Sequence, residues 1–158
     1  MPRIMKTRRS VFLGTLPLNP AHVATQLLDV YQTTGVAADY LNSLAAGVAV
    51  GVDSAGYAVP ATNIATFIGV IEAPAMEGMG VNLHSLANKQ VTYIKGATEF
   101  ETNNFVTGVA YAPGDPLGVG ANGALQKAGT AAERIGVIMS GRSAAAVDNE
   151  VPLICVLD

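Results

Sequence analysis

The sequence predicts a mainly β protein: a small β-barrel body built from two similar β-modules, preceded by an N-terminal arm and one short helix. Three observations lead to this prediction. Apolar runs are short and separated by turn residues, one glycine-marked pattern occurs twice, and helical periodicity is confined to one stretch near the N-terminus. Strands bounded by turns at intervals of about 8–12 residues are typical of all-β sandwiches and barrels.

Turn residues divide the chain from Gly47 onward. Asn122-Gly123 is the strongest hairpin signal, because both central residues of a type I′ turn need positive φ and this pair tolerates it. Residues 91–95 alternate as one strand, and Phe105, Val109 and Tyr111 indicate another. The other turn segments are Ser54-Ala55-Gly56, Glu77-Gly78-Met79-Gly80, Asn103-Asn104, Pro113-Gly114-Asp115-Pro116 and Asp148-Asn149-Glu150.

One amphipathic helix is expected over residues 19–34. Asn19-Pro20 offers an N-cap followed by proline at the first helical position, and Gly35 can end the helix. Val23, Leu27 and Tyr31 recur at a spacing of four between them. A further short helical turn is possible in 39–46. The chain is therefore divided into an arm with a helix, residues 1–40, and a β-rich body, residues 41–158.

An internal repeat is the most informative feature of the body. Residues 47–71 and 114–138 align without a gap at a constant offset of about 67, with the glycines in register. Ile68-Gly69-Val70-Ile71 then meets Ile135-Gly136-Val137-Ile138. A glycine inside a strand marks a bulge, a barrel corner or a place where another backbone comes close. Two similar strand–turn–strand modules are implied.

Composition indicates self-association or assembly. The 158 residues suit one domain; half are apolar and 13% are charged, against a typical share of about 25% charged. The surplus apolar surface is expected to be covered in an oligomer or a larger assembly. No apolar run reaches the roughly 18 residues of a membrane-spanning helix, so a soluble protein is expected. The net charge of −3, with no basic face in the body, argues against a nucleic-acid partner.

Positive charge gathers at the N-terminus, ahead of the first carboxylate at Asp29. Residues 1–18 combine these basic groups with apolar ones, so they are expected either to form a solvated tail or to dock onto an acidic partner surface. In the docking interpretation the partner-binding residues are Arg3, Lys6, Arg8, Arg9, Phe12 and Leu13.

No set of catalytic, cofactor-binding or metal-ligating residues emerges. His22, His84 and the single cysteine, Cys155, lie far apart in the sequence, and a zinc site needs three or four converging ligands. Cys155 lies in an apolar run and is expected to be a buried hydrophobic residue. Gly118 to Gly123 matches Gly-x-Gly-x-x-Gly, but in a hairpin context that does not fit a dinucleotide site. Glu99 and Glu101 are expected on one solvated strand face. The chain is therefore expected not to be an enzyme and to need no cofactor.

The order of these elements resembles the bacteriophage capsid decoration, or head cement, proteins. The matching elements lie within residues 46–158 and are Ala46 to Val50, Gly56, Ile68 to Val70, Glu77 to Val81, Pro113 to Leu117, Asn122 to Leu125, Ile135 to Val137 and Val151 to Leu157.

The resemblance implies a β-barrel or β-tulip-like body on the outer surface of the virion capsid. Such a protein binds the major capsid protein, associates with itself as a homotrimer or dimer, and clamps neighbouring capsid subunits. The first 40 residues lie outside the match. Two other hypotheses remain: another virion or surface structural module, such as a tail or fibre component, and a small β-barrel enzyme, for which no convergent titratable set was found.

Overall fold

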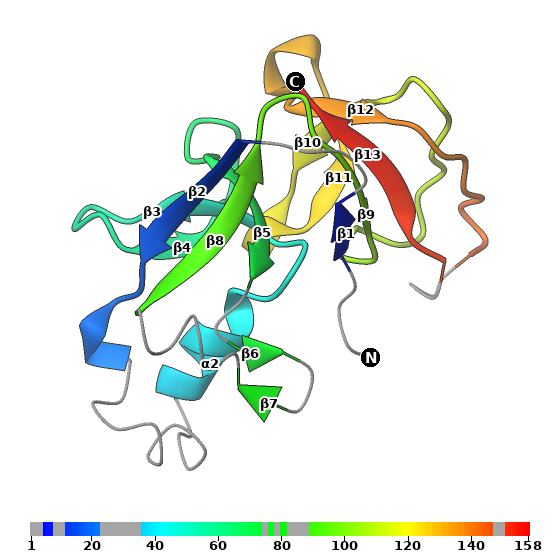
Figure 1. Cartoon of the computed structure of the whole chain (residues 1–158). Coiled ribbons are helices and arrows are strands. Elements are labelled where there is room, and N and C mark those ends of the chain that lie inside the picture. Colours follow the sequence, from blue (N-terminus) through cyan, green and yellow to red (C-terminus); the bar gives the residue numbers. More distant parts are fainter. Residues whose placement is uncertain are drawn as a thin grey trace.

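The computed structural model describes residues 5–7, 12–22, 36–73, 76–77, 80–81, 89–146 and 151–158. These residues confirm a mainly β fold, whose strands form two large antiparallel sheets and one small hairpin (Figure 1). Within this part of the chain the two sheets form a barrel-like sandwich in which neither sheet closes on itself. None of the described helices is long and apolar enough to cross a membrane.

The first sheet has five strands in the order β2-β8-β5-β3-β4. Its strands are β2 (Phe12–Pro17), β3 (Ala49–Val52), β4 (Ala58–Pro60), β5 (Gly69–Ala73) and β8 (Gln90–Lys95). The short helices η1 (Pro20–His22) and α2 (Val36–Ser43) lie between β2 and β3 in the sequence. A small hairpin of β6 (Met76–Glu77) and β7 (Gly80–Val81) lies between β5 and β8.

The second sheet has six strands in the order β1-β9-β13-β12-β10-β11. The 3-10 helices η2 (Ala121–Gly123) and η3 (Ala131–Glu133) flank β11 in the sequence. The strands of this second sheet are β1 (Met5–Thr7), β9 (Glu99–Thr102), β10 (Pro116–Val119), β11 (Leu125–Lys127), β12 (Gly136–Ile138) and β13 (Leu153–Leu157).

The sequence repeat is also a repeat of backbone pairing. Val50 faces Pro60 in the first module, and Leu117 faces Lys127 in the second, so an offset of 67 relates both partners. The amide of Ala61 donates to the carbonyl of Ala49 at 2.8 Å, and that of Ala128 donates to Pro116 at 2.8 Å. In each module the first strand lies between the other two (β4-β3-β5 and β11-β10-β12).

The repeat extends beyond the segments that the sequence aligns. β5 pairs with β8, and β12 pairs with β13 in the corresponding way. β8 then pairs with β2, as β13 pairs with β9. Five strands of the first sheet therefore correspond, in the same chain order, to five strands of the second. β1 is the additional strand, and it pairs with the outer side of β9.

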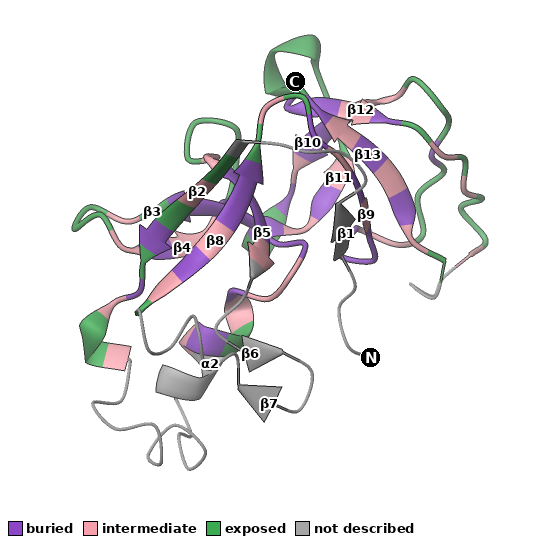
Figure 2. Ribbon diagram, viewed as in Figure 1, coloured by how far each residue is buried: buried purple, intermediate pink, exposed green. Residues whose placement is uncertain are grey.

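The two sheets share one buried core, but they contribute opposite faces to it. In the first sheet this face carries Ala49, Val70 and Ile94. In the second sheet, the residues that face the core are the repeat equivalents of residues on the opposite face of the first sheet. Leu117, for example, faces the core and is equivalent to Val50, which lies on that opposite face. That other face of the first sheet packs with Leu41 and Leu44, which come from α2 and the turn after it. The sheets are therefore stacked front to back, and buried residues alternate with half-buried ones along β13 (Figure 2).

The glycine inside each module's last strand marks a close approach of backbones. A Cβ atom at Gly69 would meet the carbonyl oxygen of Ile94, and one at Gly136 would meet the carbonyl oxygen of Val156. These carbonyls belong to the equivalent strands β8 and β13. Of the three interpretations open from sequence, close approach therefore holds at both glycines. At the predicted hairpin turn, Asn122 and Gly123 have φ values of 55° and 71°, the positive values that a type I′ turn requires.

The N-terminal region differs from the predicted arm of residues 1–40. Phe12–Pro17 and Met5–Thr7 are strands of the two sheets, so these residues belong to the β-rich body. As strands they pair their backbone N–H and C=O groups with a neighbouring strand, and Leu16 is buried in the core. Of the predicted helix 19–34, Pro20–His22 forms a 3-10 turn in which the Asn19 side chain accepts from the Ala21 amide at 3.0 Å. Residues 23–34 lie outside the described part.

The strand expected around Phe105, Val109 and Tyr111 does not form. Phe105 and Tyr111 each make a single β-bridge, to Leu125 and Arg142. Their rings pack edge to face at 5.9 Å, and the Tyr111 hydroxyl donates to the Val106 carbonyl at 2.6 Å. The two aromatic side chains therefore fix a compact loop under the second sheet, which explains their burial without strand pairing.

Candidate binding surface

Of the six residues predicted to bind a partner, the structure describes the side chain of Leu13 alone. Leu13 lies on β2 and is 55% exposed. Phe12 lies on the same strand, opposite Lys95, and Lys6 lies on β1, opposite Glu101. Arg3, Arg8 and Arg9 lie outside the described residues. The structure thus places Lys6 on one sheet and Phe12 with Leu13 on the other, instead of on one continuous arm.

The alternation of hydrogen bonds along β2 fixes which backbone groups face its outer side. The amide of Leu18, just after the strand, donates to the Lys89 carbonyl at 2.8 Å. Because backbone groups in an antiparallel pair point alternately toward and away from the neighbour, the groups of Gly14 and Leu16 point toward β8. Those of Leu13 and Thr15 point away from β8. The side chains of Leu13 and Thr15 are also exposed.

A second surface is the face of the second sheet that points away from the shared core, called here the outer face. Its apolar centre is a row of half-buried residues running across β13, β12 and β10, bordered on β9 by Glu99 and Glu101. Nothing in the sequence singled out this face, because the run Leu153–Leu157 is apolar at every position and hides the alternation. The apolar residues are Pro116, Val137, Ile154 and Val156.

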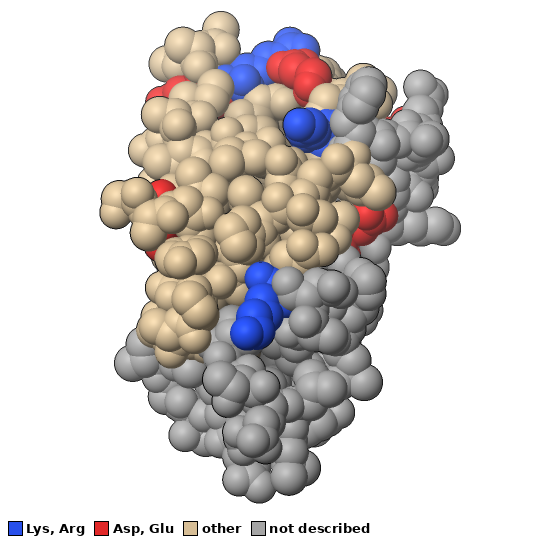
Figure 3. Space-filling model, turned by 60° about the vertical axis from the view of Figure 1, so that its left-hand side comes forward, with Lys and Arg blue, Asp and Glu red and all other residues tan. Residues whose placement is uncertain are grey.

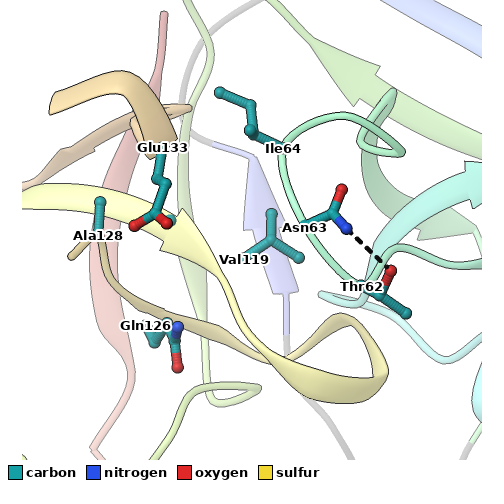
Figure 4. Close-up of a pocket in the computed structure, with 8 residues that line it drawn as sticks. Thr62, Asn63, Ile64, Val119, Gln126, Ala128 and Glu133 are labelled. Atoms are coloured by element: carbon teal, nitrogen blue, oxygen red, sulfur yellow. Dashed lines mark hydrogen bonds between the residues drawn. The ribbon is translucent and has the colours of Figure 1, made fainter. Parts of the chain in front are cut away.

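A small pocket of about 180 Å³ lies between the loop after β4 and the β10–β11 hairpin (Figure 4). The Glu133 carboxylate, on its wall, accepts from the amides of Gly129 at 3.0 Å and Thr130 at 3.1 Å. These bonds cap η3, so the carboxylate has a structural role. The lining residues are Thr62, Asn63, Ile64, Gly118, Val119, Gln126, Ala128 and Glu133.

Two described ion pairs stabilise the fold. The Asp115 carboxylate accepts from the Ala112 amide at 2.9 Å and contacts Lys127 Nζ at 3.0 Å, and these two partners hold the pKa of Asp115 below its usual range. Arg134 forms a two-pronged ion pair with Asp158, with nitrogen–oxygen distances of 2.8 and 3.0 Å. In the part of the chain that the structure describes, no three His, Cys, Asp or Glu side chains converge as a metal site.

The histidines and the cysteine have separate environments. His22 lies against the Tyr40 ring at 4.9 Å, and the Tyr40 hydroxyl donates to the Ala58 carbonyl at 2.6 Å. His84 lies outside the described residues. Cys155 is fully buried in the core between the sheets, as the sequence predicted, and burial raises the pKa of its thiol to about 12.

We expect the Cys155 thiol to be unreactive in the folded protein. Thiolate is the reactive form, and at pH 8 a thiol with a pKa of about 12 holds almost none of it. An aromatic disulfide reagent should therefore label the native chain far more slowly than the chain unfolded in guanidinium. Cys155→Ala should cost about 1–3 kcal/mol of unfolding free energy. Rapid labelling under native conditions would contradict the buried position.

The geometry defines a class of protein: a β-sandwich whose two sheets are built from five-stranded units that repeat each other. Comparisons with protein-family models, with curated proteins and with solved structures found no match for this chain.

Proposed function

We propose that the chain is a structural virion protein that binds the outer surface of a phage capsid and stabilises contacts between major capsid subunits. The observation that supports the proposal is the repeated β-sandwich, in which segments that resemble those of decoration proteins fall on matching parts of the two modules. Pro113 to Leu117 leads into β10, and Asn122 to Leu125 forms the β10–β11 turn. Ala46 to Val50 leads into β3, the equivalent of β10.

The surface is consistent with a binding role. On the side shown in Figure 3, charged side chains are few and scattered over a broad uncharged area. The outer face adds a half-buried apolar row with an acidic border on β9. Surfaces of this composition are favoured where a partner covers them, because apolar area leaves water on contact. We therefore propose two partners, the major capsid protein and further copies of this chain, as a homotrimer or alternatively a dimer.

The basic residues near the N-terminus supply the proposed attraction to the capsid. Arg3, Arg8 and Arg9 lie in a chain of net charge −3, so they form a local basic region in an otherwise acidic protein. Such a region adds attraction to an acidic surface, and added salt weakens it. Phe12 supplies the accompanying apolar contact in this proposal. Lys6 belongs to the same region, but its backbone is paired in the second sheet.

The test is co-sedimentation with heads purified from the phage that encodes the chain. The triple variant Arg3→Gln, Arg8→Gln and Arg9→Gln should bind about tenfold more weakly and depend less on salt. The matched control removes the same charge from exposed positions elsewhere, with Lys89→Gln, Lys127→Gln and Arg134→Gln. Equal loss in both variants would contradict a role for the N-terminal basic region. Binding to isolated tails instead of heads would favour the tail or fibre alternative.

A further inference from the structure

The repeat provides an internal comparison for the edge of the first sheet. In the second sheet, β1 lies along the outer side of β9, and Lys6 pairs with Glu101. In the first sheet, the equivalent of β9 is β2, and β2 is an edge strand. Within the described ranges no strand pairs with its outer side. The same structural position is therefore a paired one in one unit and a sheet edge in the other.

The backbone groups involved are equivalent as well. The amide of Leu157 donates to the Thr98 carbonyl at 2.9 Å, so the alternation along β9 points the backbone groups of Glu101 toward β1. Thr15 is the residue of β2 equivalent to Glu101, because the pairs Gly14–Tyr93 and Phe100–Cys155 correspond. Thr15 therefore directs outward the same amide and carbonyl that β1 uses in the second sheet.

β2 differs from the other edge strands in length, and from β1 and β11 also in charge. β2 has six residues, all of them uncharged, whereas β1, β4 and β11 have three each. Those short edges carry Lys6, Pro60 and Lys127, the residue types that protect natural edges from pairing with another chain. β2 has Pro17 at one end, and its Leu13 side chain is 55% exposed. Of these four edges, β2 is the one suited to accept a strand.

We propose that β2 pairs with β2 of a second copy of this chain, antiparallel about a two-fold axis at Gly14. Leu13 of one copy then faces Thr15 of the other, and both outward amides and carbonyls of each copy gain partners. A two-fold contact needs a surface that complements itself, and an uncharged strand with two outward residues around a central glycine meets that need. Leu13 is thereby assigned to the contact between copies. The inference rests on the self-association part of the proposed function.

Paired cysteines test the contact and its register. Leu13→Cys and Thr15→Cys are made as separate variants of the full chain, and the native Cys155 stays buried in both. Directly opposite residues of a hydrogen-bonded antiparallel pair have Cα atoms about 5.5 Å apart, within the roughly 4.4–6.8 Å that a disulfide spans, whereas diagonal neighbours lie about 7–8 Å apart. An oxidised mixture of the two variants should form the cross-linked dimer, and each variant alone should form several-fold less. Equal cross-linking by one variant alone would overturn this register.

A charge on the edge tests the contact without a cross-link. Thr15→Lys should weaken the dimer about tenfold or more in sedimentation velocity, because it places lysines near each other across the axis. Met139→Lys, at another exposed position, is the matched control and should leave the dimer intact. Unchanged thermal unfolding would show that Thr15→Lys still folds. A monomeric or trimeric native chain, or a dimer insensitive to Thr15→Lys, would overturn the proposal. These measurements use no phage particles, so failure of capsid binding would be seen separately.

Discussion

Replacing Gly136 by alanine should lower the free energy of unfolding by about 3 kcal/mol, at the upper end of what overpacking usually costs. The new Cβ would meet the carbonyl oxygen of Val156 and approach its carbonyl carbon to 3.0 Å. These are backbone atoms of the neighbouring strand β13, so a side-chain rotation cannot relieve the contact. Denaturant unfolding measures the change directly, and the melting temperature should fall by roughly 10 °C.

Gly69→Ala is the companion variant and should cost a similar amount, because its Cβ would meet the carbonyl oxygen of the equivalent strand, at Ile94. Gly141→Ala is the control. Its Cβ would find nothing closer than 3.7 Å, so its stability should stay near that of the native protein. If Gly69→Ala and Gly136→Ala behaved like Gly141→Ala, the two glycines would not be the close-packing positions that the repeat assigns to them.

Replacing Asn104 by alanine should also cost about 3 kcal/mol. Its side-chain amide donates to the Gly47 carbonyl at 3.0 Å and to the Gly123 carbonyl at 3.1 Å, and Asn104 is 7% exposed. The substitution would leave two buried carbonyls without this donor, and each such loss costs about 1–3 kcal/mol. Gly47 opens the first module and Gly123 lies in the turn of the second, so the amide joins the two modules.

The control for Asn104 is Asn63→Ala, because Asn63 is exposed and its hydrogen bonds are made within the same turn. Its cost should stay below about 1 kcal/mol. Chemical denaturation of both variants gives the comparison. An effect at Asn104 no larger than that at Asn63 would mean that the Asn104 hydrogen bonds contribute little to joining the modules.

The sequence predicts the modules well because their turn residues and glycines are required by local backbone geometry. The offset of 67 that aligns Gly69 with Gly136 is also the offset between hydrogen-bonded pairs such as Gly51–Val59 and Gly118–Gln126. Positive φ at Gly47 and Gly114, and at Gly56 and Gly123, explains why these glycines align. Local requirements of this kind leave a direct mark in the sequence.

The membership of β2 and β9 in the repeat could not be predicted. The equivalent positions of Phe12–Pro17 and Glu99–Thr102 carry no identical residue, since the position of an outer strand is determined mainly by the backbone of its neighbour. The front-to-back stacking also left no signal, because runs such as Leu153–Leu157 are apolar at every position and do not show which face of the strand meets the core. The partner-binding residues were chosen by charge and hydrophobicity, whereas the β2 edge depends on the direction of backbone groups at Leu13 and Thr15.

Because the two sheets stack front to back, the two faces that lie outside the shared core are not equivalent. On the first sheet, Leu41 and Leu44 cover the face that points away from the shared core, as a capping repeat covers the end of a solenoid. On the outer face of the second sheet, Val137 and Val156 are the equivalents of Val70 and Ile94, which are buried between the sheets. A further sheet that docked on this outer face would therefore meet a surface of the same kind as the one that the second unit already covers.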